Sequence, residues 1–347
     1  MLSKNESKML QGMAILAMLA LHLFCRNDNL PYQPVIMVAG VPVVYYLGLF
    51  GDICVPIYCF TSGYAQFFLA ERDGDRYRRN RLVRIWKFIR HFWLVLCLSC
   101  ITGVLLNDAD MPGTLSKLLG NLFLYNLSYN GAWWFVLTYV FLLLGAPLVV
   151  WLTNKIHPLT LVVISGVLYV IAYSFYFVYQ ITFENLIITW VWHQALLLFR
   201  SLFSFVLGAV FCHDRLFGRL REMNIRKWLK AIILIVVPLS LLVGHAVIQS
   251  LIIAPITALG CVCCFIIWDK PKWIQRIFEF LGNHSFNIWL VHMFFYLYLF
   301  ENLVFKLKYP FFIYIGMLGI CICVSYVINW LESLLNMLQK KIYRGAV

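Results

Sequence analysis

The sequence predicts an all-α membrane protein with about ten transmembrane helices. Hydrophobic residues make up 63% of the 347 residues, and charged residues only 12%. The mean hydropathy is +0.83. Soluble domains carry about twice as much charge, so this composition excludes an ordinary water-soluble protein. The apolar residues also fall into stretches of roughly 20, the length that a helix needs to cross a bilayer.

Ten apolar stretches are long enough to span. The segment 117–131 is too short and too polar, and we expect it at the outer interface or as a re-entrant segment. Because no soluble domain, long linker or fixed-period repeat is visible, residues 1–347 are expected to form a single integral membrane domain. The predicted spans cover about 9–25, 49–70, 88–106, 133–152, 158–179, 194–212, 231–248, 250–268, 280–300 and 311–336.

The basic residues predict that both termini lie in the cytoplasm, because cytoplasmic loops accumulate Lys and Arg. With ten spans and the N-terminus inside, 23 of the 28 basic residues lie on the cytoplasmic side. We therefore expect a multi-pass protein of the plasma membrane. The net charge of +13 follows from this bias and argues against a nucleic-acid partner. The exceptions are Arg26, Lys117, Lys306 and Lys308 outside and Arg200 within a helix.

The eleven cysteines predict no metal site. Most lie in apolar stretches, where free Cys behaves as a small hydrophobic residue, and their spacing matches no metal-ligand pattern. Cys25 and Cys54 both fall near the outer face, and a disulfide between them is left open.

Ionisable residues inside the apolar stretches are candidates for a functional site, because burying such a group in a bilayer is expensive. His22 lies near the outer end of the first span, and Asp52 and Arg200 also lie in outer halves. A histidine is suited to act as a general base that a nearby carboxylate orients. His22 and Asp52 are therefore predicted as a pair. The alternative is a hydrogen bond between helices, which we prefer for His245 and His292.

The loop 71–91 is the densest charge cluster, with eight basic and three acidic residues. Arg78, Arg81 and Arg84 recur at a spacing of three, so a helix would bring them to a shared face. Arginine matches phosphate oxygens well, and one hypothesis is a cytoplasmic site for a phosphorylated donor. The alternative is the ordinary bias of basic residues together with contacts to anionic lipids. The loop 213–230 allows the same two interpretations.

Trp133 and Trp134 lie at the outer mouth of the fourth predicted span. Tryptophan is common at the membrane interface, and an indole can also stack on a sugar ring. Both roles stay open, with the interfacial anchor preferred.

Four stretches carry sequence patterns that together indicate a protein family more specifically than any one of them does. They are Ser7–His22, an apolar helix that ends on histidine; Phe50–Tyr64, with Val-Pro and Ser-Gly-Tyr; Ala132–Pro147, with two tryptophans; and Leu281–His292, with Gly, Ser and His. In this order they resemble the acyltransferase-3 family of integral membrane proteins, which acylate surface sugars using acyl-CoA.

The resemblance implies that His22 is the catalytic base of an acyl transfer that uses no metal, with Asp52 as its partner. A polar group must also stabilise the oxyanion that develops in such a reaction. Ser62 and Arg200 are the expected oxyanion partners.

The same resemblance implies acyl-CoA as the donor, with Arg78, Arg81 and Arg84 binding its phosphates. The expected acceptor is a surface or lipid-linked saccharide, with Trp133 and Trp134 as candidate contacts. Membrane lipids are the other expected partners.

The chain departs from the family pattern at two positions. Gln11 stands where the family usually carries an arginine, so this charged group is lost or is supplied by Lys8, about one turn earlier. Tyr139 stands where many members carry a glutamate. This second difference is similar to the branch that modifies surface polysaccharides and has no attached soluble domain.

The expected function is therefore O-acyl transfer, with acetyl as the expected group, to a cell-surface sugar or exopolysaccharide. A transporter or flippase of a lipid-linked saccharide is the alternative, because buried charges also line transport pathways. Transporters often have internal symmetry and paired broken helices, and neither is visible in this sequence.

Overall fold

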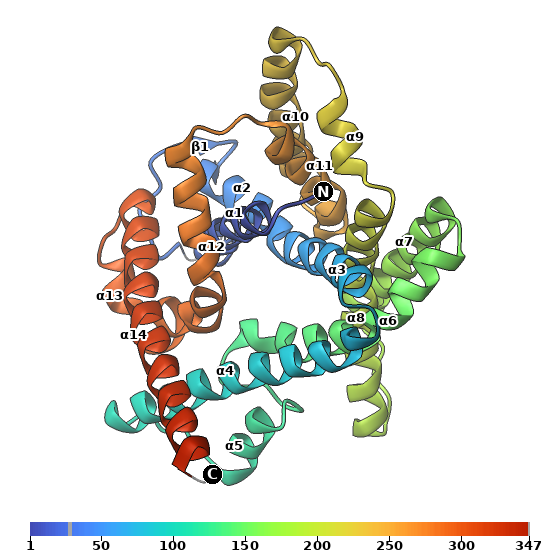
Figure 1. Ribbon diagram of the computed structural model, residues 1–347. Coiled ribbons are helices and arrows are strands. Elements are labelled where there is room, and N and C mark those ends of the chain that lie inside the picture. Colours follow the sequence, from blue (N-terminus) through green and yellow to red (C-terminus); the bar gives the residue numbers. More distant parts are fainter. Residues whose placement is uncertain (27–29, 346–347) are drawn as a thin grey trace. The chain divides into compact units, whose positions relative to one another are not determined.

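The structure is a computed structural model that describes residues 1–26 and 30–345. It is almost entirely helical, which confirms the predicted all-α class (Figure 1). In the described residues the strands are β1 (Met37–Val38) and β2 (Val41–Pro42), which form a short antiparallel hairpin.

Short 3-10 helices (η1, η2, η3 and η5) and π-helices (η4 and η6) interrupt or extend the α-helices. In chain order the helices are α1 (Lys4–Phe24), α2 (Val43–Phe50), η1 (Gly51–Ile53), α3 (Cys54–Asp73), η2 (Gly74–Arg76), α4 (Tyr77–Leu105), α5 (Leu115–Leu122), η3 (Gly131–Trp133), α6 (Trp134–Lys155), α7 (Pro158–Ser174), η4 (Phe175–Tyr179), α8 (Leu186–His213), α9 (Leu216–Glu222), α10 (Lys227–Ile248), η5 (Leu251–Ile253), α11 (Ala254–Ile267), α12 (Lys272–Met293), η6 (Phe294–Tyr298), α13 (Glu301–Phe305) and α14 (Pro310–Gly345).

Seven helical stretches in the described residues are long and apolar enough to cross a membrane. One of them, Val43–Leu105, contains both α3 and α4, which were predicted as separate spans. The predicted span 250–268 corresponds to the shorter helix α11, and the predicted span 280–300 overlaps α12, which is not among the seven. The multi-pass membrane character is therefore confirmed, whereas the count of ten stays a prediction. In segment 117–131, α5 is only eight residues long.

The described chain forms two compact units. The first comprises residues 1–26, 36–81 and 138–283, and the second comprises residues 30–35, 82–137 and 284–345. The unit boundaries fall inside α4, α6 and α12, so these helices contribute to both units.

The first unit is organised around the contact between α3 and α8, which glycines bring close together. A Cβ atom added to Gly63 would come within 1.9 Å of the Phe205 carbonyl oxygen. One added to Gly208 would come within 2.0 Å of the Phe60 carbonyl oxygen. Small residues let helix backbones approach in a membrane, where the hydrophobic effect does not drive helices together.

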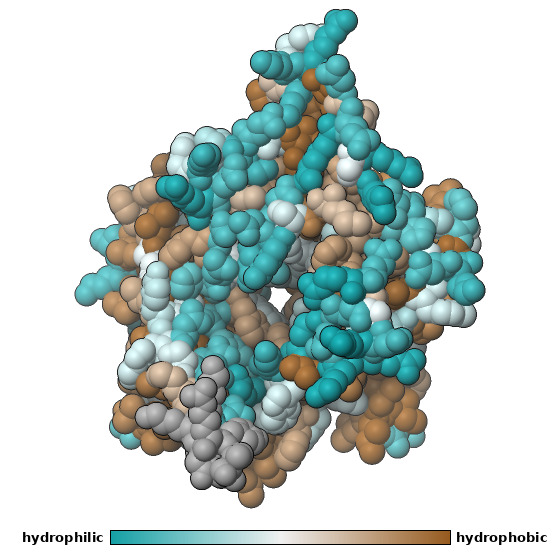
Figure 2. All heavy atoms as spheres, viewed as in Figure 1, coloured by the Kyte–Doolittle hydropathy of each residue, from teal (hydrophilic) through white to brown (hydrophobic). Residues whose placement is uncertain are grey.

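Helix α10 illustrates how the apolar surface is used. His245 is its buried residue, while Ile232, Ile235 and Leu239 are exposed in this structure. An apolar helix with so little buried surface fits a lipid-facing position. Figure 2 shows hydrophilic residues beside hydrophobic ones over the region of α9 and the start of α10.

In the second unit, polar side chains link α4, α12 and α14. The Arg90 side chain donates a hydrogen bond of 2.8 Å to the Asn336 side chain. The Trp93 indole donates one of 2.9 Å to the Leu122 carbonyl and holds α5 beside α4.

We expect Gly208→Ala to destabilise the protein by roughly 1–3 kcal/mol, because overpacking pushes α3 and α8 apart. Thermal unfolding of the purified protein in detergent measures this effect. The matched control is Gly145→Ala in α6, where an added Cβ meets nothing within 4 Å. Equal melting temperatures for the two variants would contradict the close α3–α8 packing.

Candidate functional site

His22 lies in the last turn of α1, at the end of a helix with a well-formed start. Ser3 and Glu6 form a capping box that satisfies the first amide groups of this helix. The side chain of His22 is partly exposed, whereas the neighbouring Leu23 is buried. The sequence prediction therefore placed His22 correctly on the first apolar helix, and its role as a base stays a prediction.

The 3-10 turn η1 packs directly against the end of α1. A Cβ atom added to Gly51 would come within 2.2 Å of the Ala17 carbonyl oxygen and 2.9 Å of the Leu21 amide nitrogen. Asp52, the next residue of η1, therefore lies close to the helical turn that carries His22.

The described partner of Asp52 is His245, where the sequence analysis expected His22. The Asp52 Oδ1 atom lies 2.7 Å from His245 Nε2, and both side chains are buried. The pairing arises because α10 packs on α2 and carries its buried histidine toward η1. The second polar atoms of this pair, Asp52 Oδ2 and His245 Nδ1, have no hydrogen-bond partner in the described part of the chain. The preferred interpretation of His245, a hydrogen bond between helices, is confirmed.

Ser62 is tied to the residue that departs from the family pattern. Its hydroxyl on α3 donates a hydrogen bond of 3.3 Å to the Tyr139 hydroxyl on α6. Tyr139, which by the family resemblance stands where many members carry a glutamate, therefore contacts a predicted oxyanion residue.

Arg200 on α8 is surrounded by aromatic rings. Its guanidinium carbon lies 4.4 Å from the ring centres of both Tyr176 and Phe177. Both aromatic residues belong to the π-helix η4. Aromatic faces stabilise a buried cation. The predicted oxyanion role of Arg200 is untested by this geometry.

The three arginines of α4 differ in their surroundings. The Tyr77 hydroxyl donates a hydrogen bond of 3.0 Å to Gln66 and fixes the start of α4 against α3. Arg81 is only 9% exposed, and its Nε and Nη1 atoms have no hydrogen-bond partner among the described residues. Its guanidinium lies 5.7 Å from the centre of the Tyr77 ring. Arg78 is exposed and Arg84 is half-buried.

The predicted shared face of these arginines is therefore only partly correct. Three residues advance a helix by about 300°, so side chains at a spacing of three differ in direction by about 60°. Arg78 and Arg84 consequently point about 120° apart, and Arg78 faces outward.

Trp133 is fully buried, which corrects its predicted role in sugar stacking or at the interface. Its indole donates a hydrogen bond of 2.9 Å to the Leu290 carbonyl and packs against the edges of Phe92 and Phe294. No face of the ring remains for a sugar. Trp134 is partly exposed and stays a candidate.

The sequence analysis missed a buried polar network in the second unit. His91 on α4 lies 2.9 Å from the Glu332 carboxylate and 2.5 Å from the Asn287 side-chain oxygen. The Asn287 amide donates to the Ser325 hydroxyl at 2.8 Å, and His284 Nδ1 lies 2.7 Å from the same hydroxyl. The signal was available, because Ser325, Asn329 and Glu332 recur at helical spacing within the predicted apolar span 311–336.

His292 is a buried core residue. Its Nδ1 atom donates a hydrogen bond of 2.7 Å to the Trp289 carbonyl, and its ring stacks on Tyr296. The sequence analysis preferred a hydrogen bond between helices for His292, whereas this hydrogen bond lies within α12, because its acceptor is three residues earlier on the same helix.

Two of the resembling stretches contact each other in the first unit. A Cβ atom added to Gly282 would come within 1.9 Å of the Lys8 carbonyl oxygen, and one added to Gly12 within 2.1 Å of the Phe278 carbonyl oxygen. The opening helix and the late Gly-Ser-His helix therefore cross at glycines, which explains why small residues occur there.

In the described residues no group of three or more His, Cys, Asp or Glu side chains is arranged to hold a metal ion. Cys25 and Cys54 are free thiols, so the structure does not pair them.

Comparison with known proteins identifies the family. Residues 5–330 match the family model described as an acyltransferase domain, Acyl_transf_3. No curated protein matches the chain, and no solved structure does. The matched region covers most of the 347 residues. The chain therefore belongs to the acyltransferase-3 family and is a multi-pass membrane acyltransferase.

Proposed function

We propose that this protein is an O-acyltransferase of the plasma membrane, with both termini in the cytoplasm. It moves an acyl group, acetyl in the simplest case, from acyl-CoA to a hydroxyl of a cell-surface sugar or exopolysaccharide. Family membership supports acyl transfer and favours the enzyme over a transporter or flippase of a lipid-linked saccharide.

His22 acts as the general base in this proposal. It takes the proton of the sugar hydroxyl while the hydroxyl oxygen attacks the thioester carbonyl carbon. The carbon–sulfur bond then breaks, and the departing thiolate takes the proton from His22 to give the free thiol of CoA. A positioned base of this kind contributes about 10²- to 10⁴-fold.

The oxyanion of this reaction needs a hydrogen-bond donor or a cation in a site that excludes water. Ser62 and Arg200 are the proposed groups. Ser62 is held in place by a hydrogen bond to Tyr139. The Asp52–His245 pair is proposed to position η1 against the last turn of α1.

The donor site rests on one observation, the buried guanidinium of Arg81 with two nitrogen atoms that lack partners in the described residues. A buried charge is costly unless it is paired, and a phosphate group of acyl-CoA would supply the pairing. Arg78 and Arg84, the other two predicted arginines of α4, are the further proposed phosphate contacts.

Lys8 is proposed to replace the family arginine whose position Gln11 occupies. Its Nζ atom lies 3.5 Å from the Gly282 carbonyl oxygen, at the crossing of α1 and α12. The backbone carbonyl of Gln11 accepts a hydrogen bond of 3.3 Å from Tyr58, so this turn is held between α3 and α12. Trp134 is the proposed contact for the acceptor sugar.

We expect His22→Ala to lower the rate of CoA release by about 10²- to 10⁴-fold, because the hydroxyl loses its base. The measurement uses purified protein, acetyl-CoA and polysaccharide acceptors in detergent. His157→Ala, an exposed histidine at the start of α7, is the matched control and keeps full activity. A folded His22→Ala variant with unchanged turnover would remove His22 from this role.

We expect Arg81→Gln to raise the KM for acyl-CoA about tenfold or more, because a charge-assisted hydrogen bond to phosphate is lost. The melting temperature should not fall, because the substitution leaves no other group without its hydrogen-bond partner. Arg79→Gln removes the same charge from an exposed position of α4 and serves as the control. If both variants shift KM equally, only the general positive charge of this segment matters.

A further inference from the structure

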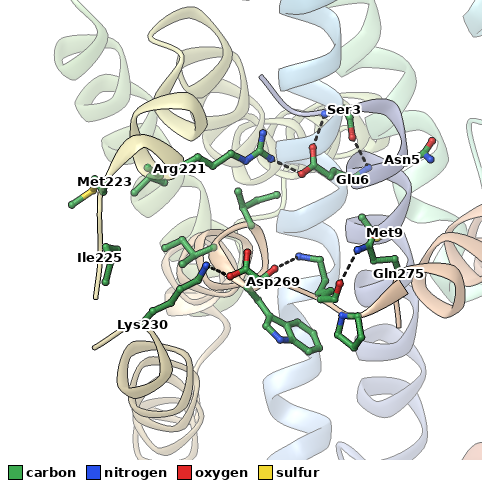
Figure 3. Close-up of a pocket in the computed structure, with 16 residues that line it drawn as sticks. Ser3, Asn5, Glu6, Met9, Arg221, Met223, Ile225, Lys230, Asp269 and Gln275 are labelled. Carbon is green, nitrogen blue, oxygen red and sulfur yellow. Dashed lines mark hydrogen bonds and ion pairs between the residues drawn. The ribbon is translucent and has the colours of Figure 1, made fainter. Parts of the chain in front are cut away.

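The first unit contains a cavity of about 910 Å³ whose lining differs from the proposed donor site. Its walls come from the start of α1, the connection between α9 and α10, and the connection between α11 and α12 (Figure 3). The volume is sufficient for a small organic ligand.

Two ion pairs form opposite sides of this cavity. Arg221 at the end of α9 pairs with Glu6 of α1, and its Nη1 atom also donates a hydrogen bond of 3.0 Å to the Met1 carbonyl. Lys230 of α10 pairs with Asp269 in the connection that follows α11 (Figure 3). These four charges compensate one another.

Lys270 supplies the remaining charge of the lining. Its ammonium group donates to the backbone carbonyls of Phe265 and Trp268, the latter at 2.9 Å, and forms no ion pair among the described residues. Burial lowers the pKa of Lys270 to about 8, so the group is still mainly protonated at neutral pH. Gln275 donates a hydrogen bond of 2.7 Å to the Lys270 carbonyl and fixes the backbone here. The cavity therefore carries one net positive charge.

Part of the remaining lining is apolar, beside the polar Ser3, Asn5 and Gln275, and it lies at the ends of apolar helices. Leu220, Met223, Ile266 and Ile267 contribute hydrocarbon, and Trp268 contributes an indole. Helices α1, α10 and α12 begin near the cavity, and α11 ends there. Such a boundary between apolar helices and polar termini is where lipid headgroups and interfacial tryptophans meet membrane proteins.

We propose that this cavity binds the phosphodiester headgroup of a phospholipid, with Lys270 as its main cationic contact and the apolar wall against the glycerol end. A phosphodiester carries one negative charge, which balances the one net positive charge of the lining. A nucleotide such as CoA carries several, and Glu6 and Asp269 would repel the excess. The assignment goes beyond the acyl-transfer reaction and does not depend on it.

The test titrates the purified full-length protein in detergent with phosphatidylglycerol and measures bound lipid by native mass spectrometry. Lys270→Gln should weaken binding about fivefold or more. Lys272→Gln removes the same charge from an exposed residue outside the cavity lining and should leave binding unchanged within about twofold. Equal losses of lipid binding in both variants would mean that only the general surface charge attracts the lipid, and would overturn the proposal.

Three further measurements make the assignment specific. Asp269→Asn removes a repelling carboxylate and should tighten phosphatidylglycerol binding, whereas a purely structural role of this cluster predicts no gain. Diacylglycerol, which lacks the phosphodiester, should not bind. Displacement of the lipid by 3′,5′-ADP would assign the phosphate to a soluble nucleotide and overturn the lipid assignment. Because every readout is lipid retention, loss of acyl-transfer activity leaves this test intact.

Discussion

The cost of burying a polar group in an apolar environment is the constraint on which this structure depends. It is clearest in the first unit, where His245 is the buried residue of α10 and meets the buried carboxylate of Asp52. Removing one partner would leave an uncompensated polar group, so this contact fixes α10 relative to η1. Because η1 packs on α1, the same contact also helps to position the turn that carries His22.

The same constraint separates two arginines that look alike in sequence. Arg200 lies beside the rings of both Tyr176 and Phe177, so the protein itself supplies favourable surroundings for its charge. Arg81 is buried with two nitrogen atoms for which the described residues provide no acceptor. An anionic ligand is the natural partner for the second kind of arginine. This difference is why the donor proposal rests on Arg81 and gives Arg200 a separate role.

The sequence was sufficient for the fold class, because hydropathy and charge bias are properties of single segments. It was insufficient for contacts between segments. Asp52 and His245 lie 193 positions apart, and their pairing depends on which helices pack together, as does the complete burial of Trp133. That Arg78 and Arg81 point in different directions could be predicted from the sequence, because helical geometry alone separates side chains at a spacing of three by about 60°. The family resemblance identified stretches that do meet, as the Lys8–Gly282 crossing demonstrates.

The two basic sites proposed for this protein differ in their carboxylates. Arg81 forms no ion pair among the described residues, so a phosphate bound there would displace no carboxylate. In the cavity beside α1, Glu6 and Asp269 neutralise Arg221 and Lys230 and leave one positive charge on Lys270. A polyanion entering that cavity would break ion pairs to gain new ones, whereas a singly charged headgroup would not. We therefore expect the acidic residues to contribute to the specificity of these proposed sites as much as the basic residues do.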